Sequence, residues 1–372
     1  MSEFAPLFQP FTCRGLTIAN RIAMAPMTRS FSPDGIPGQN VVDYYARRAA
    51  HDVGLIISEG TSPDRAGASF DANVPNFHTQ QALAGWRKVV DAVHAANGKM
   101  APQIWHVGMM RKQGAGPNPQ APSDSPSGLT HTGKPVYDEP TEEDVQDMAE
   151  SYARAAANAA ALGFDAVEIH GAHGYLIDEF FWDRMNVRSD KYGGSIAKRS
   201  AFAAEVVRLT RAAIGDNIPI ILRFSQWKQQ DYAAKLTQNP AEMETFLQPM
   251  VDAGVDIFHA SQRKFWEAEF PDIDGPDGLN TAGWVKKITG LPTITVGSVG
   301  LSSDFVTGYA TKDAAAAATG FKDLMARFNR GDFDMVAIGR ALLQDPEWAT
   351  KVKEGRLSEL TDYSAEALKT LY

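Results

Sequence analysis

The chain has 372 residues, 44% of them hydrophobic and 22% charged, and its formal net charge is −9. This composition is typical of a folded globular protein and excludes a disordered, collagen-like or coiled-coil chain. The acidic balance, without any basic cluster, argues against a nucleic-acid partner, and the absence of an apolar run of about 18 residues argues against a membrane partner.

Two features near the N-terminus bear on cellular location. Residues 1–10 lack the basic start and the apolar region of a secretory signal. The lone cysteine, Cys13, excludes an internal disulfide and an iron–sulfur cluster held by cysteines. We therefore expect a cytoplasmic protein.

Eight short apolar runs predict buried β-strands. Each run is nearly continuous rather than alternating, as expected for strands covered on both faces of a parallel sheet. The runs cover residues 21–25, 55–58, 100–105, 166–170, 220–224, 257–260, 293–296 and 335–338.

Amphipathic patterns predict a helix after every strand. They cover residues 41–50, 79–96, 141–162, 195–213, 240–252, 281–288, 321–329 and 346–354. Residues 141–144 resemble a capping box with aspartate in place of glutamate. Gly98, Gly163, Gly254 and Gly331 follow expected helix ends, where a left-handed residue is favoured.

Eight β-then-α units predict a (β/α)8 TIM barrel, an α/β fold, as a single domain over residues 1–372 with an N-terminal hairpin. The alternative is an open doubly wound sheet with a second domain, but no Gly-x-Gly-x-x-Gly follows the first strand. Residues 111–140, rich in proline and glycine, are expected to form a lid excursion after the third strand. Residues 300–320 are expected to form a late surface insertion.

The last two strands are followed by candidate phosphate loops. In such barrels the active site lies at the C-terminal ends of the strands. Gly297 and Ser298 follow the seventh strand, and Gly339 and Arg340 follow the eighth. Glycine leaves backbone N–H groups open to an anion, and Arg340 adds a positive charge. Ordinary tight turns would explain the same glycines.

His170, His173 and Tyr175 place three hydrogen-bond donors at the end of the fourth strand. The imidazoles could hold a carbonyl or nitro oxygen, and a phenol with a pKa of about 10 could supply a proton. A metal site completed by Asp178 or Glu168 is one alternative, although metal barrels need ligands from several strand ends. A pair of hydrogen-bonded histidines in a helix cap is another.

Arg223 lies at the inner end of the fifth strand. A buried guanidinium is costly unless it meets an anion or an electron-rich ring. A cofactor is therefore the favoured partner, and a buried ion pair is the structural alternative.

At this point the motifs resemble the old yellow enzyme family of FMN-dependent ene-reductases. The resemblance extends from about residue 6 to residue 348. It rests on residues 7–11, 15–22, 24–29, 163–176, 186–195 and 337–340.

The resemblance implies roles for individual residues. His170, His173 and Tyr175 would be catalytic, with Tyr175 as the proton donor. Thr28 and Trp105 would join them in binding substrate. Cofactor contacts would come from Ala25, Pro26, Met27, Thr28, Gly60, Gln103, His170, Arg223, Gly297, Ser298, Gly339 and Arg340.

The same resemblance implies an NAD(P)H-dependent flavin oxidoreductase that acts on C=C bonds by a ping-pong mechanism. NADPH or NADH would reduce FMN, and hydride from flavin N5 would pass to Cβ of an activated alkene such as an enone, enal or nitroalkene. The protein would be a monomer or a homodimer. A metal-dependent hydrolase or lyase and a catalytically silent small-molecule binder on the same fold remain as alternatives.

Several positions depart from the family's best-known members. The single cysteine excludes the branches that carry an iron–sulfur cluster, and Thr28 stands where another branch has cysteine. Residues 225–232 and 263–266 also differ. Phe265 and Trp266 either line the pocket rim or pack under a loop. Residues 361–372 do not align, so the roles of Tyr363 and Tyr372 stay open.

Overall fold

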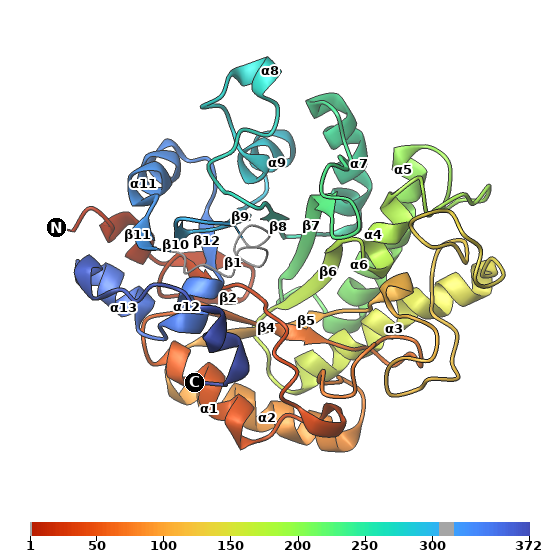
Figure 1. Cartoon of the computed structure of the whole chain (residues 1–372), viewed down its shortest axis with the longest axis horizontal. Helices are drawn as coiled ribbons and strands as arrows, with labels where there is room; N and C mark the ends of the chain where they lie inside the picture. Colours follow the sequence, from red (N-terminus) through yellow and green to blue (C-terminus); the bar gives the residue numbers. More distant parts are fainter. Residues whose placement is uncertain (1, 305–315) are drawn as a thin grey trace.

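Eight parallel strands close into a barrel at the centre of the molecule (Figure 1). The computed structural model describes residues 2–304 and 316–372. The barrel order is β12-β3-β4-β5-β6-β7-β8-β9, which confirms the predicted (β/α)8 barrel and excludes the open sheet. The strands are β3 (Ile22–Met24), β4 (Leu55–Thr61), β5 (Lys99–Ile104), β6 (Val167–His173), β7 (Ile220–Lys228), β8 (Ile257–Ser261), β9 (Thr293–Val296) and β12 (Met335–Ile338).

Helices surround the barrel (Figure 1). They are α1 (Gln39–Ala49), α2 (Gln80–Ala95), α3 (Glu142–Ala161), α4 (Leu176–Phe181), α5 (Ile196–Arg199), α6 (Ala201–Ile214), α7 (Pro240–Ala253), α8 (Pro271–Asp274), α9 (Thr281–Thr289), α11 (Phe321–Arg330), α12 (Arg340–Gln344) and α13 (Trp348–Lys353). Short 3₁₀ helices cover Ala5–Phe8, Pro33–Gly35, Gly108–Met110, Leu357–Glu359 and Ala365–Lys369.

Two predicted helices differ from the structure. The predicted helix 195–213 is divided into α5 and α6 at Ser200, whose hydroxyl donates to the Ile196 carbonyl at 2.9 Å. Such a back-bond bends a helix. The predicted helix 346–354 begins only at Trp348, after the separate short helix α12.

Most of the capping residues and left-handed glycines predicted at helix ends are confirmed. The Thr141 hydroxyl and the Asp144 carboxylate form the predicted capping box. Gly163, Gly254 and Gly331 take the predicted positive φ values. The prediction for Gly98 is wrong, because Asn97 takes the left-handed conformation with a φ of 61°. Glycine is needed at position 98 for packing, since a Cβ there would lie 2.7 Å from that of Ala49.

The N-terminal end of the barrel is closed by the predicted hairpin. Strands β1 (Phe11–Cys13) and β2 (Leu16–Ile18) pair antiparallel. Their apolar side chains join Ala23, Leu55 and other side chains of the barrel interior in one buried cluster. The cavity described below therefore lies at the opposite end of the barrel.

Three strands run three or four residues past their predicted ends. β4 continues to Thr61, β6 to His173 and β7 to Lys228. Shifts in the strand pairing after Ile57 and after Gly171 accompany these extensions. The extensions carry polar residues into the region above the barrel.

The two predicted insertions flank the barrel. Residues 111–140 form bends and turns, and none of them lines the large cavity at the barrel end. Gly300–Leu301 (β10) and Ala317–Thr319 (β11) pair antiparallel at the base of the second insertion. Residues 305–315 of this insertion lie outside the described residues.

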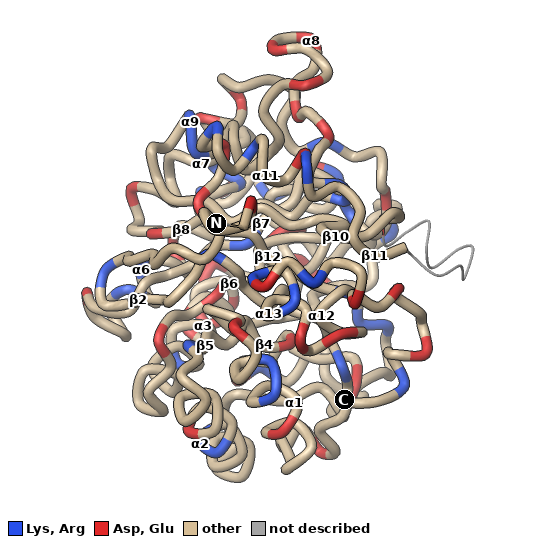
Figure 2. The backbone as a smooth tube through the Cα atoms, turned by 90° about the vertical axis from the view of Figure 1, so that its left-hand side faces the viewer, with Lys and Arg blue, Asp and Glu red and all other residues tan. Residues whose placement is uncertain are grey.

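Charged residues are interspersed over the side drawn in Figure 2, where lysine and arginine alternate with aspartate and glutamate. Within residues 2–304 and 316–372, no helix has the length and apolar character needed to cross a membrane.

Candidate active site

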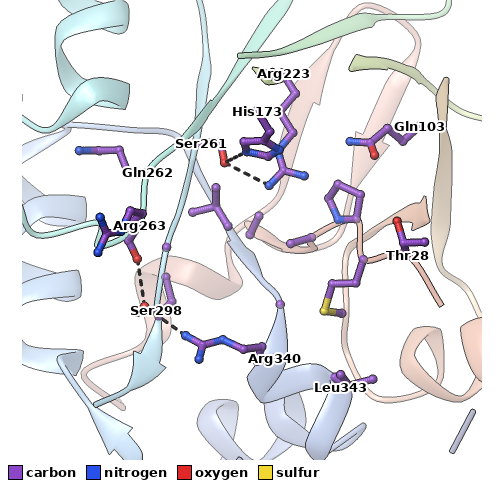
Figure 3. Close-up of a pocket in the computed structure, with 18 of the residues that line it drawn as sticks. Thr28, Gln103, His173, Arg223, Ser261, Gln262, Arg263, Ser298, Arg340 and Leu343 are labelled. Carbon is purple, nitrogen blue, oxygen red and sulfur yellow. Dashed lines mark hydrogen bonds between the residues drawn. The ribbon is translucent and has the colours of Figure 1, made fainter. Parts of the chain in front are cut away.

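A cavity of about 420 Å³ opens at the C-terminal ends of the barrel strands (Figure 3). Nearly all of the predicted site residues line it. These are Ala25, Pro26, Met27, Thr28, Gln103, Trp105, His170, His173, Tyr175, Arg223, Gly297, Ser298, Gly339 and Arg340. Its wall also includes apolar side chains, namely Val296, Val299, Leu301, Ala337, Leu343 and Leu368.

One end of the cavity is built for an anion. The Arg340 guanidinium donates to the Ser298 hydroxyl at 3.2 Å (Figure 3) and to the Ser303 carbonyl at 2.6 Å. Gly297 has a φ of 133°, and a Cβ at this position would lie 2.5 Å from the Gln262 carbonyl oxygen. Only glycine fits this turn, which brings the backbone close to Arg340. These residues could hold a phosphate.

A second cation lies deeper in the cavity. Arg223 is 7% exposed, and its guanidinium donates to the Ser261 hydroxyl at 3.3 Å. Its Nε atom has no hydrogen-bond partner, and no carboxylate within residues 2–304 and 316–372 lies within 4 Å of it. Burial lowers the pKa of Arg223, and only the field of Glu168 opposes this. The alternative of a buried ion pair is therefore not supported, and Arg223 is free to meet an anionic group.

Gln103 is held in one orientation by a buried carboxylate. Its Nε2 atom donates to Glu168 at 2.7 Å, and the other carboxylate oxygen of Glu168 lies 2.7 Å from Nδ1 of His259. Within the part of the chain that the structure describes, the amide oxygen of Gln103 has no hydrogen-bond partner. Gln103 can therefore accept a hydrogen bond from a ligand N–H group.

The extension of β6 brings the predicted histidine and tyrosine side chains together. The ring centroid of His170 lies 5.2 Å from that of His173 and 5.2 Å from that of Tyr175. His173 has a φ of 65°, where the strand pairing shifts. This unusual backbone conformation directs its side chain into the same cavity as His170.

Both imidazoles are neutral. Burial, and then the positive charge of Arg223, lowers the pKa of His170 and of His173 well below the usual range. Nδ1 of His170 accepts the backbone N–H of Ala172 at 3.2 Å, so Nε2 carries the ring proton. His170 can therefore donate this hydrogen bond into the cavity.

His173 is fixed by two contacts outside its own strand. Its Nε2 atom lies 2.8 Å from the Ser261 hydroxyl (Figure 3), and its ring stacks on Trp227 at 4.6 Å. The Ser261 hydroxyl also accepts from Arg223. Ser261 thus links the buried cation to the histidine.

Tyr175 packs edge-on against Trp105, with ring centroids 4.9 Å apart. Burial raises the pKa of its phenol above the usual value, while a hydrogen bond from Gln229 opposes this. The hydroxyl is therefore protonated at neutral pH and can act as an acid.

The carboxylates considered for a metal shell are engaged elsewhere. Asp178 accepts from Lys228 at 2.5 Å and from the Gly174 N–H at 2.6 Å. Glu168 binds Gln103 and His259 as described above. Among residues 2–304 and 316–372, no three His, Cys, Asp or Glu side chains are grouped to hold a metal ion.

Some residues lie away from their predicted places. Gly60 does not line the cavity, and a Cβ there would lie 2.3 Å from the Trp105 indole. Phe265 is fully buried and packs against Trp266 with ring centroids 5.2 Å apart, which favours the interpretation that both pack under a loop. Tyr363 lines the cavity of its own chain.

Sequence reasoning assigned no role to several lining residues. Trp227 and Gln229 lie beyond the predicted end of the fifth strand, and Ser261 lies one residue past the predicted sixth strand. The polar and aromatic residues after Phe224 were the only signal. No sequence signal indicated that Tyr363 and Leu368 line the cavity, because the path of the C-terminal segment depends on distant contacts.

The sequence profile of the NADH:flavin oxidoreductase / NADH oxidase family matches residues 6–359. The chain belongs to this family. Old yellow enzymes are among its structural relatives, so the resemblance noted in the sequence is confirmed.

Curated relatives agree with this assignment. The NADH oxidase of Thermoanaerobacter brockii is 33% identical over 97% of this chain and 52% of its own length. The 12-oxophytodienoate reductase 7 of Oryza sativa subsp. japonica is 41% identical over 57% of this chain and 56% of its own length. The chain thus spans about half the length of these two relatives. The flavin oxidoreductase hxnT of Emericella nidulans is 32% identical over 98% of this chain and 94% of its length.

Solved structures of the old yellow enzyme family share the fold. A complex of morphinone reductase with tetrahydroNAD superposes with a TM-score of 0.77 at 26% identity, covering 97% of this chain and 93% of that chain. An old yellow enzyme homologue from Zymomonas mobilis gives a TM-score of 0.77 at 25% identity, covering 97% and 96%.

Proposed function

We propose that this family member is an FMN-dependent ene-reductase that uses NADPH or NADH to reduce an activated alkene such as an enone, enal or nitroalkene. One observation carries the proposal. Two neutral imidazoles and a protonated phenol converge on a cavity that also holds the Arg223 guanidinium, which has no carboxylate partner among the described residues, and a glycine turn suited to phosphate. The names of similar proteins, reductases of 12-oxophytodienoate and morphinone, support the same class of reaction.

The residues present fit FMN. Arg340, Gly297 and Ser298 would hold its single phosphate, and Arg223 would face the ring edge on which negative charge gathers. The free amide oxygen of Gln103 would accept an N–H of the ring. Ala25, Pro26, Met27 and the other apolar wall residues would pack against the ring system. When bound, the flavin would supply the hydride chemistry, taking a hydride from the nicotinamide and giving it to the alkene.

His170 and His173 would bind the activating oxygen of the substrate. Because both rings are neutral, they donate hydrogen bonds without placing a proton on the oxygen. These bonds strengthen as negative charge develops on the oxygen, so they stabilise the transition state more than the bound substrate.

Tyr175 would donate a proton to Cα as the hydride reaches Cβ. Its Oη–H bond breaks, a Cα–H bond forms, and the phenolate regains a proton from water. The raised pKa keeps the phenol protonated at neutral pH, which suits an acid that acts once in each turnover.

The visible spectrum of the purified protein tests this proposal. We expect flavin absorbance, release of FMN on denaturation, bleaching by NAD(P)H without oxygen, and return of the colour on addition of a cyclohexenone-type substrate. A protein that fails to bind FMN would refute the cofactor. A reduced protein that no activated alkene reoxidises would refute the substrate class.

A further inference from the structure

The C-terminal part of β7 lies against the turn that carries Tyr175. His173 pairs with Lys228 in the barrel sheet, and the Gln229 N–H donates to the His173 carbonyl at 3.3 Å. Lys228 donates to Asp178 at 2.5 Å, and both side chains are at most 1% exposed. Asp178 also accepts the backbone N–H of Gly174. These contacts fix the β7 extension relative to residues 173–175.

The side chain of Gln229 reaches the phenol of Tyr175. Its Nε2 atom donates to Oη of Tyr175 at 3.1 Å, and both residues line the cavity. A phenol that accepts this bond must direct its own proton elsewhere. The ring is flanked by Trp105 and His170 at centroid distances of 4.9 and 5.2 Å. The proton is thereby left available to a ligand in the cavity.

We propose that Gln229 is a positioning residue that presents the Tyr175 proton to substrate and stabilises the phenolate left behind. The inference rests on the proposed function, in which Tyr175 would protonate Cα of the alkene and a bound flavin would supply the hydride. As the Oη–H bond breaks, the bond from Gln229 becomes a bond to a charged oxygen and strengthens. Gln229 therefore favours the transition state over the bound substrate.

A reversed amide would have the opposite effect. If the amide oxygen of Gln229 accepted the phenol proton, it would hold that proton away from the substrate. Removing the amide would then leave proton transfer unchanged or make it faster. The two orientations thus predict different outcomes, since only an amide that donates to Tyr175 makes its removal slow proton transfer.

The first experiment compares Gln229→Leu and Gln229→Glu with the wild-type holoenzyme by anaerobic stopped-flow. We expect Gln229→Leu to slow reoxidation by cyclohexenone about tenfold, the effect of losing one bond to a developing charge. Gln229→Glu should be slower still, because a carboxylate accepts the phenol proton and retains it. Flavin reduction by NAD(P)H, which needs no proton from Tyr175, should be unchanged in both variants.

The matched control is Gln248→Leu. Gln248 lies on α7, where its amide donates to Asp252 at 2.7 Å on the exposed surface. This variant should retain both half-reactions at wild-type rates. Reoxidation of Gln229→Leu at or above the wild-type rate would overturn the proposal.

A second measurement does not depend on turnover. Replacing the tyrosines by fluorotyrosine lowers the phenol pKa values into a range where the protein can be titrated. The ¹⁹F NMR signal of residue 175 is assigned as the one that is absent from the spectrum of Tyr175→Phe. We expect Gln229→Leu to raise the pKa of this phenol by about one unit in the apoprotein and the holoenzyme. An unchanged pKa would show that Gln229 does not donate to Tyr175.

The two proposals fail in different ways. If reduced wild-type protein is not reoxidised by activated alkenes, the proposed function is wrong. If the wild type is reoxidised and Tyr175→Phe is reoxidised equally fast, the proton source lies elsewhere and the roles of Tyr175 and Gln229 are both wrong. If Tyr175→Phe is slow while Gln229→Leu is normal in rate and in the titration, only the role of Gln229 is wrong.

Discussion

The two ends of the barrel differ in how their arginine side chains are paired. At the N-terminal end, Arg14 and Arg211 both contact the carboxylate of Asp256, which also accepts the Ile220 N–H at 2.8 Å. At the C-terminal end, Arg223 has no such carboxylate among the described residues. The first arrangement holds the fold together, while the second keeps a cation available for a ligand.

Apolar packing shows the same contrast. The hairpin closes the N-terminal end, where Phe11, Leu16 and Ile18 join the barrel interior. The C-terminal end keeps an open cavity lined by polar side chains. Substitutions at the first end should therefore cost folding stability, and substitutions at the second should cost binding and turnover.

The largest expected effect is on turnover. Tyr175→Phe keeps the ring that packs on Trp105 but removes the proton. We expect reoxidation by cyclohexenone to slow by about 100- to 1,000-fold, because a positioned general acid contributes on the order of 10²–10⁴. Stopped-flow absorbance of the flavin measures this, and thermal unfolding should stay close to wild type. A normal rate would place the proton source elsewhere.

The next effect concerns the closed end. Ile18→Ala removes a fully buried side chain from the hairpin and should lower the free energy of unfolding by about 3 kcal/mol. The affinity for FMN should be retained. The neighbouring exposed residue gives a control, Thr17→Ala, which should change stability by less than about 0.5 kcal/mol. Urea unfolding of the apoprotein measures both, and equal losses would contradict the proposed role of the hairpin.

The third prediction compares arginines at the two ends. Arg223→Ala should weaken FMN binding about 100-fold, roughly 2.7 kcal/mol, since it removes a bond to a charged group. Arg211→Ala should leave FMN binding intact and destabilise the fold, because it removes a partner of Asp256. Titration of each apoprotein with FMN, followed by flavin fluorescence, measures the affinities. If the two variants bound FMN equally tightly, the two ends of the barrel would not differ in their role in FMN binding.

The smallest effect is on the pH dependence of stability. The folded-state pKa values of His170 and His173 lie well below the usual range, mainly through burial. As pH falls below about 6.5, the unfolded chain binds protons that the folded protein does not, so the free energy of unfolding decreases by about 1.4 kcal/mol per pH unit for each imidazole.

The variant His170→Gln/His173→Asn should therefore lose less stability on acidification than the wild type. Urea unfolding of the apoprotein at about pH 7.5 and about pH 5.5 measures the difference. Equal losses in the two proteins would show that these imidazoles are not buried in neutral form.

The sequence predicted most of the site because strand ends in a closed barrel converge. Arg223 and His170 lie near the predicted ends of neighbouring strands and pair in the sheet, so their chain positions already placed them together. Gln229 could not be placed in this way. Its contact with Tyr175 depends on how far β7 runs past its apolar core, and no local pattern specifies that length.

The C-terminal segment shows the same limit. The side chain of Arg29 donates to the carbonyls of Ala367, Leu368 and Thr370, which places Leu368 and Tyr363 in the cavity wall. Backbone carbonyls are present at every residue, so nothing in the sequence marks these three as partners of Arg29.

The sequence by itself determined the barrel, its N-terminal hairpin and the residue types at the strand ends, because apolar periodicity and glycine placement act locally. Only the tertiary structure decided that Arg223 has no carboxylate partner among the residues it describes, that Ser261 links Arg223 to His173 and that Gln229 reaches Tyr175. Those contacts join residues far apart in the chain, and their geometry exists only once the strands have closed into a barrel.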